Sequence, residues 1–253
     1  MGHHFERTDA AGATHQIAYA SQEGASPGVV FCGGFRSDMT GTKATALAEW
    51  AERTGRGFTR FDYFGHGQSS GAFIDGTASH WRDDVCAVLD HLTDGAQILV
   101  GSSFGGYMSL LAALDRPEKV AGLVLIAPAP DMTERLLWKT MPAAARAEIE
   151  SEGVTLRPSE DGDYPVTRAL IEDGRGHLVL DKPIALDIPV AIIHGQQDVV
   201  VPWRLSLKLA ERLEGAVELV LLKDGDHRLN APAQLVAIIA RIEAVASEIA
   251  RRE

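Results

Sequence analysis

The sequence predicts an α/β fold in which helices cover both faces of a mostly parallel central sheet. Short apolar runs alternate with segments of helical periodicity along most of its 253 residues. A Gly-x-Ser-x-Gly stretch, Gly101 to Gly105, stands between one apolar run and one helical pattern. An aspartate and a histidine, Asp198 and His227, follow two later apolar runs in that order. At 45% hydrophobic residues, a chain of this length predicts one domain with a full-sized core.

The first elements alternate in order along the chain. Residues 14–20 are expected to form an antiparallel edge strand, and 29–32 a short apolar strand. A helix over 42–53 leads to a strand over 58–63. The next helix, over 79–93, presents an apolar stripe to the sheet that consists of Trp81, Val85, Val88, Leu89 and Leu92.

The later elements keep this alternation with one interruption. Apolar runs predict strands at 97–100, 123–127, 189–195 and 217–222. A helical pattern begins at Gly106, and Pro202 opens another helix, since proline is favoured in a first turn. The last helix carries apolar residues at helical spacing from Leu235 to Ile249, which would cover the sheet.

The Gly-x-Ser-x-Gly stretch has the pattern and the context of a nucleophile elbow, the strand-turn-helix motif of α/β-hydrolases. The turn is sharp and its central residue is strained, so glycines are needed where a Cβ would clash with the strand or the helix. The motif would hold the hydroxyl of Ser103 at the carboxyl edge of the sheet, beside the positive end of a helix. Ser103 is therefore the expected nucleophile.

Two residues downstream complete a candidate catalytic triad, because nucleophile, acid and base follow one another along the chain in this fold. Asp198 lies in the loop after the strand at 189–195, and His227 lies just beyond the strand at 217–222. Both therefore fall on the edge where open α/β sheets build their sites. We expect His227 to take the proton of Ser103, and Asp198 to orient the imidazole and stabilise its charged form.

Each of these residues also has an ordinary structural interpretation. A serine in a glycine-rich turn is usually a turn residue, and an aspartate after a strand is usually a cap or a solvated carboxylate. Asp226 is the main rival of Asp198 as the acid, and Asp224 is a weaker one. Both rank below Asp198, because they precede the base by too few residues to approach its ring from the far side. His194, before a glycine at a strand end, is interpreted as buried scaffold.

An early loop predicts the oxyanion hole, which needs two backbone N–H groups about 3 Å from the developing charge. Phe104, directly after the nucleophile, would donate one, and Phe35, in the loop after the strand at 29–32, the other. Because both donors belong to the main chain, the two phenylalanine side chains are free to line an acyl pocket. An ordinary tight turn at Gly33-Gly34 is the alternative interpretation.

Residues 128–187 interrupt the alternation with no convincing central strand, at the point where hydrolases of this fold place a lid. We therefore expect a hydrolase core of 1–127 and 188–253 with this segment as a small lid insertion. Methionines and a tryptophan in its first helix would suit an acyl chain, although the same face could simply pack the lid on the core. The candidate substrate-binding residues are Met132, Trp138 and Met141.

Composition narrows the class of partner and the compartment. A net charge of −11 argues against nucleic acid and against anionic membrane surfaces. No apolar run approaches the roughly 20 residues of a membrane span, so stable membrane insertion is not expected. Cys32 falls in a predicted strand and Cys86 in a predicted helix, which favours buried thiols in a reducing compartment. With no hydrophobic signal core, and with Glu6 and Asp9 near the N-terminus, the sequence predicts a cytoplasmic protein.

Seven stretches along the chain together form a pattern far more specific than the elbow alone. They are Ser37 to Lys43, Arg60 to Tyr63, Trp81 to Val85, Gln97 to Gly106, Arg116 to Val120, Val201 to Trp203 and Asp226 to Arg228. Through them the chain resembles the α/β-hydrolase family of the mitochondrial palmitoyl-protein thioesterase that also hydrolyses mycophenolic acid acyl-glucuronide, and its bacterial relatives. The resemblance covers most of the chain, and the lid matches least.

The resemblance implies a serine esterase or thioesterase with no metal or organic cofactor, acting on a small-molecule or acylated-protein ester or thioester. It assigns the nucleophile, acid and base to Ser103, Asp198 and His227. One departure is Gly33, where such hydrolases usually have a histidine that braces the oxyanion loop. A non-catalytic ligand-binding protein on the same fold, an acyltransferase and a lipase-like esterase remain as alternatives. Acyl-chain length, leaving group and oligomeric state stay open.

Overall fold

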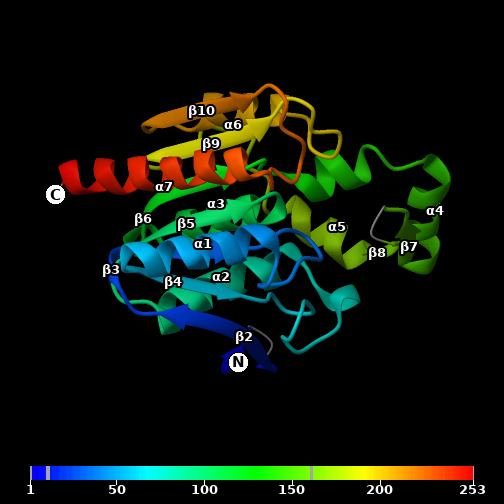
Figure 1. The fold of residues 1–253 in the computed structure, drawn as a ribbon. Coiled ribbons are helices and arrows are strands. Elements are labelled where there is room, and N and C mark those ends of the chain that lie inside the picture. Colours follow the sequence, from blue (N-terminus) through cyan, green and yellow to red (C-terminus); the bar gives the residue numbers. More distant parts are fainter. Residues whose placement is uncertain (1, 10–11, 160–161, 253) are drawn as a thin grey trace.

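The computed structural model describes residues 2–9, 12–159 and 162–252. Eight strands form one sheet, shown in Figure 1. In spatial order they are β1 (His3–Thr8), β2 (Thr14–Gln22), β4 (Arg56–Phe61), β3 (Ala25–Cys32), β5 (Gln97–Ser102), β6 (Val120–Ile126), β9 (Val190–Gly195) and β10 (Val217–Leu222). The pairs β1–β2 and β2–β4 are antiparallel, and from β4 to β10 neighbouring strands are parallel. The predicted mostly parallel α/β fold is confirmed.

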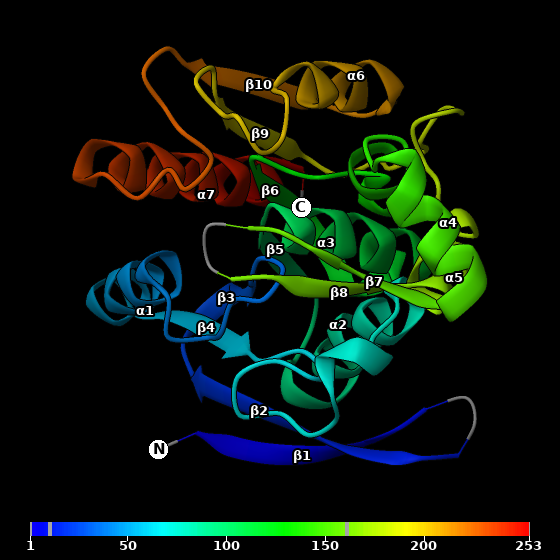
Figure 2. The ribbon, with the colours of Figure 1, turned by 90° about the vertical axis from the view of Figure 1, so that its right-hand side faces the viewer.

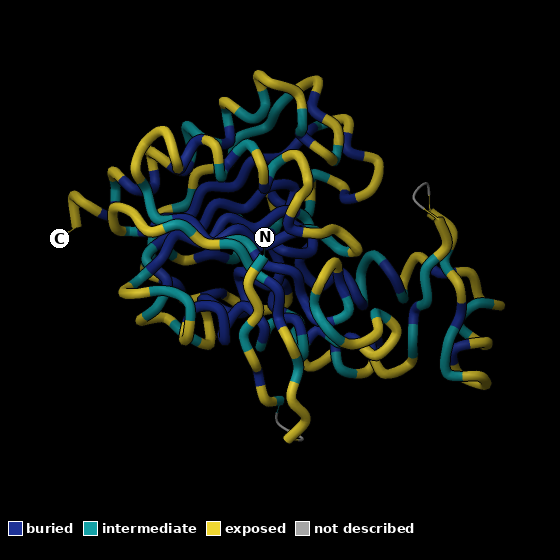
Figure 3. The backbone as a smooth tube through the Cα atoms, turned by 60° about the horizontal axis from the view of Figure 1, so that its bottom comes forward, coloured by how far each residue is buried: buried dark blue, intermediate teal, exposed yellow. Residues whose placement is uncertain are grey.

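Helices cover both faces of this sheet. On one face, α1 (Thr42–Thr54) and α7 (Pro232–Arg252) share an apolar cluster with side chains of the central strands. On the other face lie α2 (Ala78–Leu92), α3 (Phe104–Asp115) and α6 (Arg204–Arg212). The central strands β5 and β9 are buried along their whole length. Figure 3 shows the buried centre of the molecule in dark blue, surrounded by exposed segments. The sheet is therefore a rigid platform for the loops at its carboxyl edge.

The N-terminal strands differ from the sequence prediction in one respect. The strand expected at 14–20 forms as β2, but it is not the edge, because β1 pairs with its outer side from His3 opposite Tyr19 to Thr8 opposite Thr14. β1 has little apolar alternation, so its periodicity was too weak to predict a strand. A long-range contact secures it instead, since the Arg7 guanidinium is buried 2.6 Å from a carboxylate oxygen of Asp84 in α2.

The segment between β6 and β9 forms a separate group of elements beyond the carboxyl edge of the sheet (Figure 1). These are the π-helical segment η3 (Thr133–Trp138), α4 (Ala143–Glu152), β7 (Val154–Arg157), β8 (Tyr164–Thr167) and α5 (Arg168–Arg175). β7 and β8 pair antiparallel in a two-stranded sheet of their own, which crosses in front of α3 in Figure 2. Two short 3-10 turns, η1 (Phe73–Asp75) and η2 (Pro117–Lys119), complete the elements of the described residues.

Candidate active site

The turn between β5 and α3 holds Ser103 in a strained conformation. Its φ of 55° and ψ of −116° lie outside the regions that L-residues favour. A Cβ on Gly101 would lie 2.4 Å from the carbonyl oxygen of Gly105, and a Cβ on Gly105 would lie 2.1 Å from that of Cys32. Both glycines are thus sterically required, and the turn holds the half-buried Ser103 hydroxyl at the N-terminus of α3.

Of the three residues expected to form a triad, His227 lies within hydrogen-bonding distance of both others. His227 Nε2 is 3.0 Å from Ser103 Oγ, and His227 Nδ1 is 2.6 Å from Asp198 Oδ2. Because the carboxylate only accepts, Nδ1 carries the hydrogen and Nε2 is left to accept from the serine hydroxyl. Asp198 follows β9 and His227 follows β10, and these strands are parallel neighbours, so their carboxyl ends meet at one edge of the sheet.

The Asp198 carboxylate has partners for both oxygens. Oδ1 accepts from the backbone N–H groups of Val200 and Val201, at 2.8 and 2.7 Å. Oδ2 accepts from His194 Nε2 at 3.0 Å in addition to His227. Burial alone would raise the pKa of Asp198, but the hydrogen bonds from His194 and His227 hold it well below its usual value. The carboxylate therefore stays ionised and faces the imidazole of His227.

His194 is buried, as the sequence predicted, and its Nδ1 lies 2.7 Å from Ser206 Oγ. Its contact with the acid was not predicted, because only the folded loop brings the two side chains together. Neither rival acid is the hydrogen-bond partner of the base, since the two ring nitrogens of His227 contact Asp198 and Ser103. Asp226 is exposed and its Oδ1 accepts from the backbone N–H of Leu229, while Asp224 is also exposed.

Lys43 holds the loop that carries His227, a role that the sequence did not suggest. Its ammonium group donates to the carbonyl oxygen of Arg228 at 2.5 Å and to Oδ1 of Asn230 at 3.3 Å. Burial lowers the pKa of Lys43 to about 8. Lys43 lies in the first turn of α1, where the helix dipole disfavours a positive charge. The contact with the loop that carries His227 therefore explains why a lysine occupies this position. The only signal was its place in the Ser37 to Lys43 stretch.

The loop at 33–37, predicted to form the oxyanion hole and called the oxyanion loop below, lies beside Ser103, since a Cβ on Gly34 would be 4.0 Å from Ser103 Cβ. The backbone N–H groups of Phe35 and Phe104 have no hydrogen-bond partner among the described residues. Their side chains pack in an aromatic cluster instead of facing an open pocket, and Phe104 is only 2% exposed. The Phe35 ring has centroid distances of 5.0 to 5.6 Å to Phe73, Tyr164, Phe104 and Trp81.

The candidate substrate-binding residues of the segment 128–187 contribute mainly to packing. Met132 and Met141 are buried in the same apolar cluster as α2 and α3. Trp138 is half-buried against this cluster, and the guanidinium groups of Arg146 and Arg175 lie 5.9 and 5.1 Å from its ring centroid. Of the three, Trp138 thus keeps the most accessible side chain.

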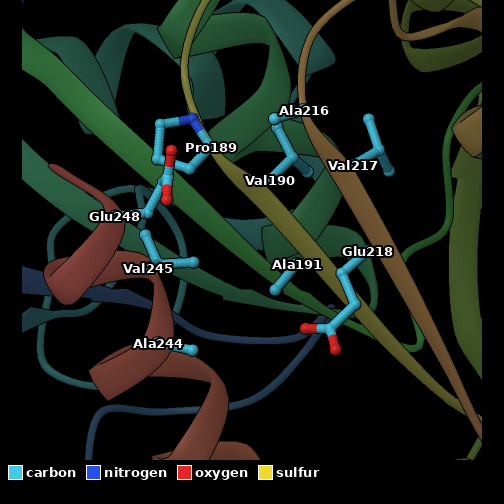
Figure 4. Close-up of a pocket in the computed structure, with 9 residues that line it drawn as sticks. All are labelled: Pro189, Val190, Ala191, Ala216, Val217, Glu218, Ala244, Val245 and Glu248. Carbon is cyan, nitrogen blue, oxygen red and sulfur yellow. The ribbon is translucent and has the colours of Figure 1, made fainter. Parts of the chain in front are cut away.

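An open groove lies at the other end of the sheet, where β9 and β10 begin (Figure 4). Small apolar residues form its floor, and Glu218 and Glu248 stand at its sides. Glu218 is paired with Arg241 at 2.8 Å. Because Asp198 and His227 follow the opposite, carboxyl ends of these strands, this groove is separate from the candidate active site.

Comparisons with known proteins show which family the chain resembles. A family model described as "alpha/beta hydrolase fold" matches residues 29–167. The human palmitoyl-protein thioesterase ABHD10, mitochondrial, is 39% identical over 231 residues, which are 90% of this chain and 75% of that protein. The structure of alpha/beta hydrolase domain-containing protein 10 from mouse is 35% identical, with a TM-score of 0.90 over 98% of this chain and 99% of that one. Est1E from Butyrivibrio proteoclasticus, solved with ferulic acid, is 21% identical with a TM-score of 0.77 over 96% of this chain and 99% of its own, and shares the fold.

The relatives overturn the cytoplasmic location predicted from the sequence. Proteins that match 90% of the chain, from human and mouse, are named as mitochondrial. The prediction rested on the acidic N-terminal residues, but residues 3–8 form β1 of the central sheet. No helix of residues 2–9, 12–159 and 162–252 is both long and apolar enough to cross a membrane.

Proposed function

The chain belongs to the α/β-hydrolase family, as the palmitoyl-protein thioesterase ABHD10 does, and from this membership we propose that it is a serine hydrolase of carboxylic esters or thioesters. The acyl group would be transferred to Ser103. The observation that carries the proposal is the hydrogen-bonded series from Asp198 through His227 to Ser103. The thioesterase relatives favour acyl substrates, either small molecules or acylated proteins.

The reaction proceeds in two steps. His227 Nε2 takes the proton of Ser103 while Oγ attacks the carbonyl carbon, and the imidazolium is stabilised by the ionised Asp198. The tetrahedral oxyanion accepts hydrogen bonds from the N–H groups of Phe35 and Phe104. His227 then gives its proton to the departing alcohol or thiol. In the second step, His227 deprotonates water, which attacks the acyl-enzyme and restores Ser103.

We further propose that residues 128–187 act as a lid on a core of 1–127 and 188–253. The contacts between the β7–β8 hairpin and the oxyanion loop support this role. The Tyr164 ring lies 5.6 Å from that of Phe35, and the Arg36 guanidinium lies 5.3 Å from the centroid of Tyr164. Arg36 also donates to the carbonyl oxygen of Gly162 at 2.7 Å. An acyl group entering beside Phe35 would therefore meet this hairpin.

The test is hydrolysis of p-nitrophenyl esters from acetyl to palmitoyl, with palmitoyl-CoA alongside, by the wild type and Ser103→Ala. Ser102→Ala is the matched control, because it makes the same change one residue earlier, at the end of β5. We expect steady turnover that Ser103→Ala reduces by at least about 10³-fold and Ser102→Ala preserves. The preferred chain length reports the space under the lid.

A fluorophosphonate probe gives an independent readout, because it labels an activated serine without needing the right acyl group. Labelling of the wild type and of Ser102→Ala, but not of Ser103→Ala, supports the proposal. Absence of both turnover and labelling in the wild type contradicts it and favours a non-catalytic ligand-binding protein. Labelling that persists in Ser103→Ala shows that another residue is the nucleophile.

A further inference from the structure

His66 lies in a glycine-flanked loop that follows β4, outside the elements that supply Ser103, Asp198 and His227. The two glycines are both at positive φ, 69° at Gly65 and 47° at Gly67. A Cβ on Gly65 would lie 2.7 Å from the backbone nitrogen of Phe73, and a Cβ on Gly67 would lie 2.2 Å from Asp62 Oδ2. The loop therefore turns tightly and carries His66 inward, where the side chain is only 4% exposed.

Both ring nitrogens of His66 have a partner, and the partners define its tautomer. Nδ1 is 3.0 Å from the carbonyl oxygen of Phe64, which can only accept, so Nδ1 carries the hydrogen. Nε2 is then a lone-pair acceptor, and the backbone N–H of Arg36 donates to it at 3.1 Å. Burial lowers the pKa of His66, which keeps the ring neutral and this acceptor available near pH 7.

The peptide that His66 holds adjoins the candidate oxyanion donor. Arg36 has a φ of 62°, a strained conformation for a non-glycine residue that needs support from its surroundings. Phe35, directly before it, supplies the N–H proposed for the oxyanion. Fixing the Arg36 amide therefore fixes the orientation of the Phe35 backbone.

The ring of His66 is itself held in place. It lies 5.2 Å from the ring of Phe73 and 5.7 Å from that of Trp81, and Trp81 donates to the same carbonyl oxygen of Phe64 at 3.0 Å. Asp62 also links the segment after the oxyanion loop to the loop that carries His66. Its carboxylate accepts from the backbone N–H groups of Met39, at 2.6 Å, and Gln68, at 2.8 Å. The oxyanion loop is thus attached to a rigid part of the core.

We infer that His66 is a positioning residue for the oxyanion hole, because its Nε2 accepts from the Arg36 amide that adjoins Phe35. The inference rests on the proposed function and deepens it. His66 does not touch the reacting atoms, but acts through the Arg36 amide on the Phe35 donor.

A pair of polar substitutions separates positioning from packing. His66→Asn can keep the hydrogen bond to Phe64 but is too short to reach Arg36, whereas His66→Gln can place an acceptor where Nε2 stands. We expect His66→Asn to lower kcat for p-nitrophenyl butyrate by about 10- to 100-fold, less than the loss of a whole donor, with KM within about twofold. His66→Gln should recover most of this rate. His80→Asn is the matched control, since the hydrogen bond of the His80 ring is to the nearby carbonyl oxygen of Asp75 and not to the oxyanion loop.

Affinity for a tetrahedral analogue gives a readout that a merely structural role would not move selectively. An alkyl trifluoromethyl ketone forms an oxyanion in the hole, so its inhibition constant should weaken in His66→Asn by about the same factor as kcat. Unchanged kcat and unchanged analogue affinity in a folded His66→Asn would overturn the inference. If His66→Asn does not fold, His66→Phe, which keeps an aromatic ring without the acceptor, replaces it.

Hydrogen exchange of the Arg36 amide, measured by NMR, keeps this inference separate from the proposed function. Faster exchange in His66→Asn than in the wild type and His66→Gln supports the bracing role, and equal exchange in all three contradicts it. A wild type with neither turnover nor fluorophosphonate labelling would reject the proposed function, whereas an active wild type matched by His66→Asn would reject only the role of His66.

Discussion

At the scale of single residues, the candidate site is organised by hydrogen bonds that leave each side chain one orientation. Two backbone N–H groups donate to Oδ1 of Asp198, and His194 and His227 both contact Oδ2. The carboxylate is thereby fixed with Oδ2 toward His227. Its low pKa keeps it ionised across the neutral range. The geometry makes Asp198, and not Asp226, the partner of the base.

Replacing Asp198 with Asn should therefore be far more damaging than the same change at Asp226. Asn keeps the volume but offers an amide to His227 Nδ1, which favours the wrong tautomer, and we expect kcat to fall by about 10⁴-fold. Asp226→Asn should retain kcat within about threefold, because its carboxylate contacts the Leu229 amide instead of the base. Steady-state kinetics on one p-nitrophenyl ester measure both. Equal losses would return Asp226 to consideration as the acid.

Lys43 gives a pH dependence of stability whose sign follows from burial. Its pKa falls from 10.5 to about 8 in the folded protein, so between these values the unfolded chain binds more protons than the folded one. The free energy of unfolding of the wild type should therefore rise relative to Lys43→Met as the pH increases from 7.5 to 9.5. Urea unfolding of both proteins at the two pH values measures the difference. A relative fall over this interval would contradict a depressed pKa.

At the scale of elements, the proposed lid is hydrogen-bonded to the core at the first turn of α2. Asp173 of α5 accepts from the backbone N–H and the hydroxyl of Ser79, in the first turn of α2, at 2.9 and 2.6 Å. His177 Nε2 lies 2.8 Å from the same hydroxyl, and the Tyr107 hydroxyl of α3 donates to the His177 carbonyl oxygen at 2.6 Å. The proposed lid is thus also joined to α3, which begins directly after Ser103.

Removing this joint should destabilise the folded protein without removing a catalytic group. Asp173→Ala removes the carboxylate that accepts from the Ser79 N–H and hydroxyl. We expect the free energy of unfolding to fall by about 1–2 kcal/mol. Glu172→Ala, an exposed neighbour on the same helix, is the control and should change it by less than about 0.5 kcal/mol. Urea denaturation followed by circular dichroism measures both. Equal effects would mean that α5 is held by apolar packing alone.

At the scale of the whole molecule, two apolar clusters enclose the sheet, and a buried ion pair connects its first strand to them. Arg7 and Asp84 are 5% and 0% exposed at their side chains, so neither charge has water as an alternative partner. Asp84 also accepts from the backbone N–H of Phe64 at 2.8 Å, beside the loop that carries His66. The position of β1 is therefore coupled to the core under the oxyanion loop.

Arg7→Met should be among the most destabilising single changes outside the apolar core. It leaves the Asp84 carboxylate buried without its counter-ion, and breaking such a pair costs about 3–5 kcal/mol. The control is Arg116→Met, which breaks a solvent-exposed pair with Asp90 and should cost less than about 1 kcal/mol. Unfolding in guanidinium chloride compares the two variants. Similar losses would mean that water reaches Asp84 in the variant.

Much of the fold and the core of the candidate site could be predicted from the sequence, because their signals are local. The alternation of apolar runs and helical stripes predicted the parallel strands, and β10 forms at the residues expected, 217–222. The glycines around Ser103 reflect a steric demand within five residues. Asp198 and His227 were found because chain order and strand ends are visible in one dimension.

Only the tertiary structure decided the contacts between residues that are far apart in the chain. β1 joins the sheet as its edge strand, and β7 and β8 pair with each other in the segment 128–187, although no local pattern predicted these strands. His66 reaches Arg36 across 30 positions, and Lys43 reaches Arg228 across 185. Periodicity and spacing report the shape of a segment, whereas such partners are selected by how separate segments pack. The sequence by itself thus determined the fold class and the candidate triad, and folding determined which residues hold them in place.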